Sequence, residues 1–402
     1  MANLSEQSRR RSEIPQSIPE TWFWRKVTEI CRPKQWPTIS KAELTATGYV
    51  VFGANGTIGF YSSFTHSESV VAITCRGATC GTVHRIPPYS YVTGNAMALD
   101  DRDEATVTLD YLFHALNYRG FSDVISGSAQ PQITREGLTP VEIPIPPLPE
   151  QKKIAAILSA VDETIAKTES VIAQLQIVKK AMMEQLLTKG MPGRHTRFKQ
   201  TEIGEIPEEW EVVSVRDVAK SVVPGRNKPS VFDGTIPWLT IADLQHTVVT
   251  DSSAGLRVSQ TELNNCGGKT VPAGTVIMSC VGRLGIVSIS GCIVTMNQQL
   301  HGFACGPSID PLFLCLVLRS AERQMQALAG KTTIPYLNKA RCEEIVIPLP
   351  CLPEQRAVAE QIAPIETSLA SEEAVLLQMR HLKSALSSSL LSGEIRVVAG
   401  VA

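Results

Sequence analysis

A five-residue run that occurs twice constrains the fold of this chain more than any other feature. Leu148-Pro149-Glu150-Gln151-Lys152 returns as Leu352-Pro353-Glu354-Gln355-Arg356, with 204 positions between equivalent residues. In both copies an Ile-Pro-X-Pro segment precedes the run, and about forty residues with a seven-residue apolar pattern follow it. Because these landmarks recur together at a fixed distance, we interpret the chain as a tandem duplication that folds as two similar halves.

The long segments after the two runs each predict a helix with one narrow apolar stripe. Apolar residues recur at steps of four and three, a pattern that favours left-handed supercoiling around a partner helix. We predict that the two helices serve each other as an antiparallel coiled coil. The predicted seam comprises Ile154, Leu158, Val161, Ile165, Ile172, Leu175, Met182 and Leu186 in the first helix, and Val358, Ile362, Ile365, Leu369, Leu376, Met379, Leu386 and Leu390 in the second.

Polar residues interrupt the predicted seam at equivalent positions. Thr168 and Lys179 in the first helix correspond to Glu372 and Lys383 in the second. Polar residues in such a seam often fix the register and the partner at some cost in stability. The alternative is that the lysine stems extend from a frayed helix end and keep their ammonium groups in water. Pro364 corresponds to Ala160 in the first helix, and it predicts a kink or a delayed start of the second helix.

Further landmarks recur in the same order in both halves, although the spacing between them drifts. The long segments match without a gap, whereas the globular parts carry insertions relative to each other. The two repeated tryptophans are expected to be core anchors, with base stacking as the less favoured role. The matched landmarks are Ile18-Pro19-Glu20-Thr21-Trp22 with Ile206-Pro207-Glu208-Glu209-Trp210, Gly56-Thr57-Ile58-Gly59 with Gly282-Arg283-Leu284-Gly285, Asp110-Tyr111-Leu112-Phe113 with Asp310-Pro311-Leu312-Phe313, Asn95 with Asn297, and Gly127 to Pro131 with Gly330 to Pro335.

The predicted fold class is α+β. Two mixed α/β domains are joined by two long helices, with a pseudo-two-fold internal repeat. Short β-branched segments bounded by Gly or Pro predict strands at 48–52, 69–73 and 274–278, and one helix is predicted late in each domain, at 109–118 and 311–328. The predicted division is a polar tail at 1–13, a first domain at 14–147, a first heptad helix at 148–190, a linker at 191–205, a second domain at 206–351 and a second heptad helix at 352–397.

Composition narrows the classes of function. The net charge is −1, from 38 basic and 39 acidic residues, so the chain has no global basic field for nucleic acid. Any such binding must rest on local patches or on partner subunits. The ten cysteines form no Cys-X-X-Cys pair, so we expect reduced core thiols, with a zinc site as the less favoured alternative. The sequence has no apolar segment long enough to span a bilayer, and we expect a cytoplasmic protein with no membrane partner.

Three segments resemble catalytic motifs, but each of them departs from its motif at a position that the chemistry requires. Gly330-Lys331-Thr332 resembles the end of a phosphate-binding loop, but Met325 stands where that loop needs glycine. Ile86-Pro87-Pro88-Tyr89 resembles the loop with which amino-methyltransferases hold a flipped base, but isoleucine cannot supply its polar first side chain. The run from Gly53 to Gly59 lacks the G-x-G-x-x-G spacing, so a tight turn is favoured over a nucleotide site. We therefore expect no catalytic residues and no metal ligands.

The paired junctions resemble those of a known family. Each is an Ile-Pro-X-Pro-X-Leu-Pro-Glu-Gln segment that leads into a heptad helix, and an Ile-Pro-Glu-X-Trp segment opens each half. Together they resemble the specificity (S) subunit of a type I restriction-modification system, from about Ile14 to Arg396. The resemblance implies two target-recognition domains, each of which reads one half of a bipartite DNA site, and two helices that pack antiparallel.

The same resemblance implies a non-catalytic subunit of a larger enzyme. That enzyme would be an adenine-N6 methyltransferase and an ATP-dependent endonuclease. The expected partners are double-stranded DNA, two methyltransferase subunits and two restriction/translocase subunits. No cofactor is expected on this chain, whereas S-adenosylmethionine, ATP and Mg are expected on the partner subunits.

Helix length gives this function a physical basis. A helix over 149–189 would be about 60 Å long at about 1.5 Å per residue, and DNA advances about 3.4 Å per base pair. Such helices could hold two reading domains more than one turn of DNA apart and so set the spacer of a split site. A competing interpretation is an assembly scaffold that binds only protein partners, which the near-neutral charge favours. A lone methyltransferase is disfavoured because the motifs of such enzymes are absent from the sequence.

Base-contacting residues are expected on polar loops beside the repeated glycines. Arg, Lys, Asn and Gln can read base edges or hold phosphates, and loops on a rigid scaffold often carry such contacts. For each residue, a solvated loop position without function is an equally good interpretation. The candidates are Lys34, Gln35, Asn55, Ser128 and Gln130 in the first domain, and Arg226, Asn227, Lys228, Arg283, Lys331, Thr332 and Thr333 in the second.

Overall fold

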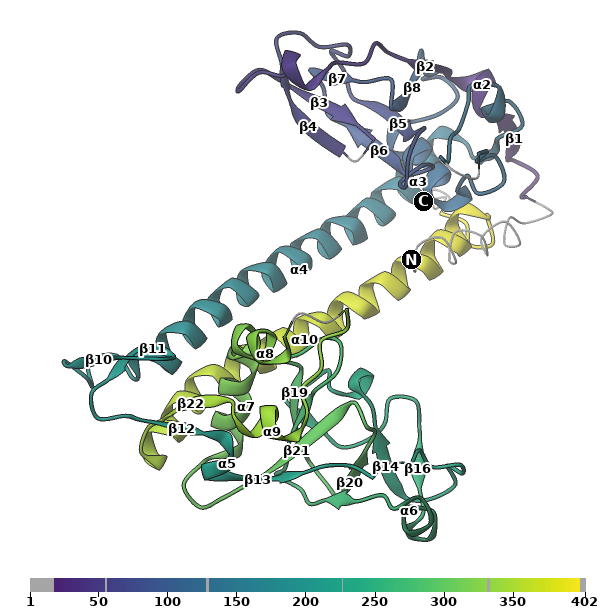
Figure 1. Cartoon of the computed structure of the whole chain (residues 1–402). Helices are drawn as coiled ribbons and strands as arrows, with labels where there is room; N and C mark the ends of the chain where they lie inside the picture. Colours follow the sequence, from purple (N-terminus) through teal and green to yellow (C-terminus); the bar gives the residue numbers. More distant parts are fainter. Residues whose placement is uncertain (1–17, 55, 128–129, 226, 331–332, 398–402) are drawn as a thin grey trace, which may run out of the picture. The chain divides into compact units, whose positions relative to one another are not determined.

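The computed structural model describes residues 18–54, 56–127, 130–225, 227–330 and 333–397 (Figure 1). The chain divides into two compact units. Unit 1 comprises Met1–Glu169 and Val375–Ala402, and unit 2 comprises Ser170–Ala374. Each unit therefore contains one globular domain and one half of each long helix.

The domain of unit 1 is built around a four-stranded antiparallel sheet with strand order β2-β8-β5-β6. Its central strands β5 and β8 are buried along their whole length, as expected for apolar runs covered on both faces. One face packs against helix α3, and the other packs toward a second sheet of order β4-β3-β7. The strands are β1 (Phe23–Lys26), β2 (Arg32–Gln35), β3 (Tyr49–Gly53), β4 (Gly56–Tyr61), β5 (Val70–Thr74), β6 (Val83–Ile86), β7 (Ser90–Val92), β8 (Ala96–Asp100) and β9 (Glu142–Ile145); the helices are α2 (Val27–Ile30), η2 (Lys41–Glu43), α3 (Leu109–Arg119) and η3 (Glu136–Leu138).

Local sequence signals fix the ends of α3. The Thr108 side chain accepts a hydrogen bond from the Tyr111 N–H at the first turn, and Gly120 follows the last turn with a φ of 65°. The helix predicted at 109–118 is therefore confirmed, as are the strands predicted near 48–52 and 69–73.

The domain of unit 2 repeats this plan and adds elements to it. Its main sheet has the order β13-β21-β18-β19-β15, and a second sheet has the order β16-β14-β20-β17. The strands are β10 (Phe198–Thr201), β11 (Gly204–Pro207), β12 (Glu211–Ser214), β13 (Ala219–Val222), β14 (Ile236–Leu239), β15 (Val248–Val249), β16 (Arg257–Val258), β17 (Thr270–Val271), β18 (Val276–Ser279), β19 (Val287–Ser290), β20 (Val294–Met296), β21 (Leu300–Cys305) and β22 (Val346–Leu349); the helices are α5 (Val215–Val218), η4 (Ile241–Asp243), α6 (Gln260–Cys266), α7 (Pro311–Ser320), α8 (Glu322–Ala329) and α9 (Lys339–Glu343).

The single helix predicted at 311–328 is wrong. Asp310 caps α7 and Pro311 occupies its first turn, as the sequence indicates. At Ala321, however, the backbone leaves the helical region, with φ −86° and ψ 13°. Its N–H bonds to the Leu318 carbonyl, three residues back, so the turn tightens and the chain restarts as α8.

Hydrogen bonds show which parts of the two domains correspond, and they correct three of the landmark matches. The Cys75 N–H bonds to the Asn95 carbonyl, and the Cys280 N–H bonds to the Gln299 carbonyl, so Asn95 matches Gln299 rather than Asn297. By the same pattern Gly282 matches Gly77, not Gly56, because each donates to the carbonyl of a matching proline, Pro335 or Pro131.

The third correction concerns the start of the late helix. Thr108 caps α3 and Asp310 caps α7. Thr108 is therefore the counterpart of Asp310, and the match of Asp110 with Asp310 is wrong by two residues. The two domains preserve the positions of caps and hydrogen bonds rather than residue types.

The two long helices are α4 (Leu148–Lys189, 42 residues) and α10 (Leu352–Leu391, 40 residues). Gly190, with a φ of 73°, follows the end of α4. Helix α10 begins at Leu352 and continues through Pro364, so the predicted delay of its start is wrong. All sixteen predicted seam residues have buried or half-buried side chains.

Equivalent ion pairs join the two helices within each unit. In unit 1, Lys383 Nζ lies 2.5 Å from Asp162 Oδ1. In unit 2, Lys179 Nζ lies 2.6 Å from Glu366 Oε1. The repeat relates these two ion pairs. The α10 residue 204 positions after Asp162 is Glu366, and the one 204 positions after Lys179 is Lys383. Both lysines of the seam are therefore bound by a carboxylate of the other helix, which favours a role in fixing register over free solvation.

Candidate nucleic-acid interface

The repeated glutamine is a buried joint between each long helix and its domain. In unit 1, Gln151 accepts a hydrogen bond from the Thr108 N–H at 2.8 Å. Its amide donates to the carbonyls of Thr106 and Pro146, both at 2.8 Å. The side chain thus satisfies three backbone groups, including an N–H at the start of α3 that has no partner within the helix.

The same three contacts recur in unit 2. Gln355 accepts from the Asp310 N–H at 2.8 Å and donates to the carbonyls of Ser308 (2.9 Å) and Pro350 (2.8 Å). Both glutamines are fully buried. The motif therefore fixes the angle between helix and domain in each unit, a role that sequence reasoning missed.

The repeated glutamate binds the repeated tryptophan. Trp22 Nε1 donates to Glu150 at 3.0 Å, and Trp210 Nε1 donates to Glu354 at 3.1 Å. Both indoles are buried, so the prediction that they are core anchors is confirmed. Burial alone would raise the pKa of the Glu150 carboxyl, but hydrogen bonds from Arg396 and Trp22 outweigh it and hold the pKa below its ordinary value.

A nitrogen-bearing side chain from the segment after a long helix completes each of these sites. Arg396 forms two hydrogen bonds to Glu150, at 2.7 and 2.9 Å. In unit 2 a histidine replaces the arginine, and His195 Nε2 lies 2.7 Å from Glu354 Oε1. The stretch 191–205, expected to be a plain linker, thus contributes a buried side chain and also contains β10.

Four loops converge at one end of the main sheet in the first domain. The Cys75 N–H, after β5, bonds to the Asn95 carbonyl, before β8, at 3.0 Å. The Gly77 N–H bonds to the Pro131 carbonyl at 3.1 Å, which brings in the loop that contains Gln130. Thr74 Oγ1 donates to the Ala54 carbonyl at 2.8 Å and ties the tip of the β3–β4 hairpin to the same place.

Three equivalent loops converge in the second domain, and a fourth loop, which follows β13, joins them. The Cys280 N–H bonds to the Gln299 carbonyl at 2.8 Å, and the Gly282 N–H bonds to the Pro335 carbonyl at 2.9 Å. Gln298 Nε2 donates to the Gly225 carbonyl at 3.0 Å, which ties in the loop after β13. Loops gathered at one end of a rigid sheet are well placed to contact a ligand.

Lys34 and Gln35 lie in strand β2, so the prediction that they lie on a loop is wrong. The sequence did not reveal the strand because β2 is a short polar edge strand that contains Pro33, which an edge position tolerates. Both side chains have internal contacts. Gln35 donates to the Gly94 carbonyl and to Cys75 Sγ, each at 3.1 Å, and Lys34 Nζ lies 3.4 Å from the centre of the Trp36 ring.

The other described candidates are exposed at the converging loops. Gln130, Asn227, Lys228 and Thr333 have exposed side chains, and so does Arg283. The candidates Asn55, Ser128, Arg226, Lys331 and Thr332 lie outside the described residues.

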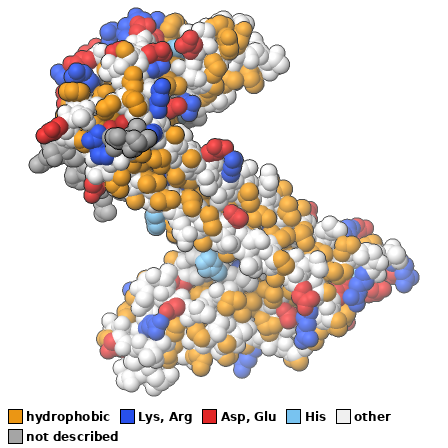
Figure 2. Space-filling view, turned by 180° about the vertical axis from the view of Figure 1, so that it is seen from behind, with side chains coloured by type: hydrophobic (Ala, Val, Ile, Leu, Met, Phe, Trp, Pro, Cys, Tyr) orange, Lys and Arg blue, Asp and Glu red, His pale blue; other side chains and the backbone are white. Residues whose placement is uncertain are grey.

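Sequence reasoning missed Arg76 and Gln132, which are exposed in the converging loops of the first domain. The signal that could have found them is the recurrence of Thr74-Cys75-Arg76-Gly77 as Ser279-Cys280-Val281-Gly282. On the face drawn in Figure 2, basic and acidic side chains are interspersed over the globular part of each unit. This agrees with local patches rather than a broad basic field.

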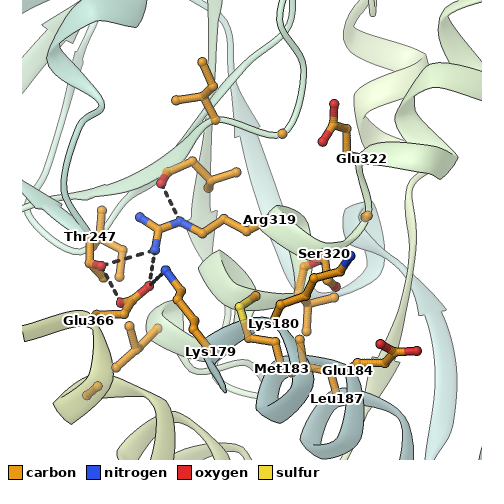
Figure 3. A pocket seen from close by; sticks show the side chains of 18 of the residues that line it. Lys179, Lys180, Met183, Glu184, Leu187, Thr247, Arg319, Ser320, Glu322 and Glu366 are labelled. Carbon is orange, nitrogen blue, oxygen red and sulfur yellow. Dashed lines mark hydrogen bonds and ion pairs between the residues drawn. The ribbon is translucent and has the colours of Figure 1, made fainter. Parts of the chain in front are cut away.

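A hollow of about 1660 Å³ lies within unit 2, lined by parts of α4, α7, α10 and the β18–β19 loop (Figure 3). Glu366 projects into it and is bound by Lys179, Arg319 and Thr247. Lys179 and Arg319 thus share one carboxylate. This ionic network joins α7 to both long helices within unit 2 and engages both cations inside the unit.

Burial alone would raise the pKa of the Glu366 carboxyl, but hydrogen bonds from Lys179 and Thr247 and the nearby Arg319 charge lower it below its ordinary value of 4.5. The ionised Glu366 carboxylate thus stabilises the folded unit at neutral pH. This stabilisation is lost as the pH falls through the lowered pKa. Glu366→Gln is expected to destabilise unit 2 by about 3 kcal/mol at pH 7, and the difference should shrink below about pH 4. Urea unfolding at both pH values measures this.

The exposed Glu373→Gln change on the same helix is the matched control, and it should have little effect at either pH. An equal loss of stability at pH 7 and at pH 3.5 for Glu366→Gln would contradict the ionic role of this carboxylate.

Seven of the ten cysteines are buried. Burial raises the pKa of Cys31 to about 12 and that of Cys280 to about 11, which keeps these thiols protonated at neutral pH. Among the residues that the structure describes, no three His, Cys, Asp or Glu side chains are grouped so that they could hold a metal ion. No helix within the described ranges is both long and apolar enough to cross a membrane.

Comparison with known proteins gives consistent relatives. Residues 19–176 and 207–378 match the family described as Type I restriction modification DNA specificity domain. The type I restriction enzyme MjaVIII specificity subunit of Methanocaldococcus jannaschii is 30% identical over 300 residues, 71% of this chain and 70% of that protein. The EcoprrI specificity subunit of Escherichia coli is 31% identical over 114 residues, 28% of each chain. The solved S subunit of a type I restriction-modification system from M. genitalium shares the fold, with a TM-score of 0.68, 15% identity and coverage of 94% of this chain and 97% of that one.

Proposed function

Because this chain belongs to the family of type I restriction-modification DNA specificity subunits, we propose that its two domains each read one half of a bipartite DNA site. Recognition of DNA sequence is the general role of the family. The observation that carries the proposal is the convergence of equivalent loops at one end of the sheet in both domains. Equivalent loops on diverged domains suit the reading of two different half-sites.

We propose that α4 and α10 form an antiparallel coiled coil that sets the spacer between the half-sites. The equivalent ion pairs Lys383–Asp162 and Lys179–Glu366 support one fixed register. The burial of the sixteen seam residues supports an apolar interface along both helices. A further support is the glutamine joint, since it fixes each domain on a helix.

Specificity subunits of type I systems are non-catalytic, and we propose that the chemistry resides on partner chains. Two methyltransferase subunits would use S-adenosylmethionine, and two restriction/translocase subunits would use ATP and Mg. This chain would bind none of these cofactors itself. The near-zero net charge supports a shared role in DNA binding, because partners can supply the positive field that this chain lacks.

The alternative is a scaffold that joins protein partners without reading DNA, which the near-zero net charge also suits. We expect that a host expressing this chain with its methyltransferase partner gains N6-methyladenine in one split motif, detected by methylome sequencing. A host expressing the partner alone is the control, and it should lack the motif. If the two proteins form a soluble complex and no new motif is methylated, the proposal that this chain reads DNA is wrong. The scaffold function is then the one that stands.

A further inference from the structure

One backbone arrangement recurs in both domains and carries different side chains. In the first domain, the Ile133 N–H bonds to the Cys75 carbonyl at 3.0 Å, and the Gly77 N–H bonds to the Pro131 carbonyl at 3.1 Å. This pair of bonds sets Arg76 directly opposite Gln132 in an antiparallel bridge. Residues opposed in this way have their side chains next to each other on the same face.

The second domain contains the same bridge. The Leu337 N–H bonds to the Cys280 carbonyl, and the Gly282 N–H bonds to the Pro335 carbonyl, both at 2.9 Å. Val281 is thereby opposed to Tyr336. The backbone is held in one geometry while both of the residues that it presents change from polar to largely apolar.

Glycines leave the backbone beside both bridges uncovered. Gly77 has a φ of 92° and Gly282 a φ of 75°, values that disfavour any residue with a Cβ. An added Cβ at either position would meet no atom within 4 Å, so space in front of the backbone is open. A ligand can therefore approach the bridge closely in both domains.

The side chains on the first bridge are free to bind. Arg76 and Gln132 are exposed, and among the described residues neither side chain has a hydrogen bond or an ion pair. Both can make two hydrogen bonds to one base edge, arginine to guanine and glutamine to adenine. The second bridge offers a half-buried Val281 and a Tyr336 that is 52% exposed, which suit contact with an apolar group such as a thymine methyl.

We propose that these two opposed pairs are specificity-determining residues. Arg76 and Gln132 read purine edges in one half-site, and Val281 and Tyr336 occupy the equivalent place in the other half-site. This inference rests on the proposed DNA-reading function and names the residues that perform it. Gln35 is not among the base-reading residues that we propose, because its amide donates a hydrogen bond within the domain.

The test is methylome sequencing of hosts that express the full chain with its methyltransferase partner. For Arg76→Ala and for Gln132→Ala, we expect one position of one half-site to become degenerate, with a loss of base preference of about 5- to 150-fold at that position. The spacer and the other half-site should not change. Tyr336→Ala should relax one position of the opposite half-site and leave the first half-site intact.

Matched variants separate base reading from charge and from folding. Arg25→Ala removes the same charge from an exposed strand position of the same domain and should leave the motif unchanged. Arg76→Lys keeps the charge but not the two-pronged geometry, and it should also relax the motif. This variant decides the matter if the alanine variants do not fold.

Three outcomes would overturn the inference while DNA reading stands. One is a wild-type split motif that neither Arg76 variant alters. Another is a uniform drop in methylation without a change of motif, which would make Arg76 a phosphate contact. The third is relaxation of the same half-site by Arg76 and Tyr336 variants. Absence of any split motif in the wild type would instead refute the proposed function itself.

Discussion

Replacing Gln355 by leucine is expected to destabilise unit 2 by about 3 kcal/mol, because three backbone groups, two of them part-buried and one buried, lose their partner at about 1 kcal/mol each. These groups are the Asp310 N–H and the carbonyls of Ser308 and Pro350. Leucine fills a similar volume but cannot bond to any of them. The loss should concentrate at the start of α7, where the Asp310 N–H needs an acceptor from outside the helix.

Amide hydrogen exchange on the full chain separates the two joints. Gln355→Leu should speed exchange in α7 of unit 2 and leave α3 of unit 1 protected, and Gln151→Leu should do the reverse. Gln361→Leu is the matched control, since Gln361 is exposed on the same helix as Gln355, and it should change stability by about 0.5 kcal/mol or less. Unaltered exchange in α7 for Gln355→Leu would show that the joint does not stabilise this unit.

The long helices could be predicted from the sequence because their signal is local and periodic. Both helix starts at Leu148 and Leu352 follow from the repeated run, and the end at Lys189 follows from Gly190. The role of Gln151 could not be predicted in this way. Its partners are backbone groups of Thr106, Thr108 and Pro146, and a backbone group has no signature in the sequence.

The candidate interface was only partly predictable, because its equivalence rests on hydrogen bonds between distant loops. Gly56 and Gly282 were matched by residue type, whereas the bonds to Pro131 and Pro335 show that Gly77 is the counterpart of Gly282. The match by residue type points to the hairpin tip, whereas the hydrogen bonds point to the loop that contains Arg76. A second cause is that the side-chain pairs at the two bridges share no chemistry, so similarity between the two halves gives no signal at these positions.

A single heptad inserted at equivalent points of both long helices is expected to lengthen the spacer of the methylated motif and to leave both half-sites unchanged. The insertion points lie between Ser170 and Val171 and between Ala374 and Val375, halfway between the seam ion-pair residues of each helix. The contacts within unit 1, and those within unit 2 apart from the contacts of Ser170, then keep their partners. Seven residues add about 10 Å of helix, which corresponds to at most about three base pairs of DNA.

Methylome sequencing of a host with the extended chain and its methyltransferase partner measures the spacer directly. A heptad inserted only in α4 is the control, because the pairs Lys179–Glu366 and Lys383–Asp162 could not then both form between continuous helices. This control should lose methylation, since a broken register misplaces one domain relative to its half-site. If the double insertion methylates the original spacer, or if it alters the bases of either half-site, the helices do not set the distance, and the domains must find their half-sites independently of helix length.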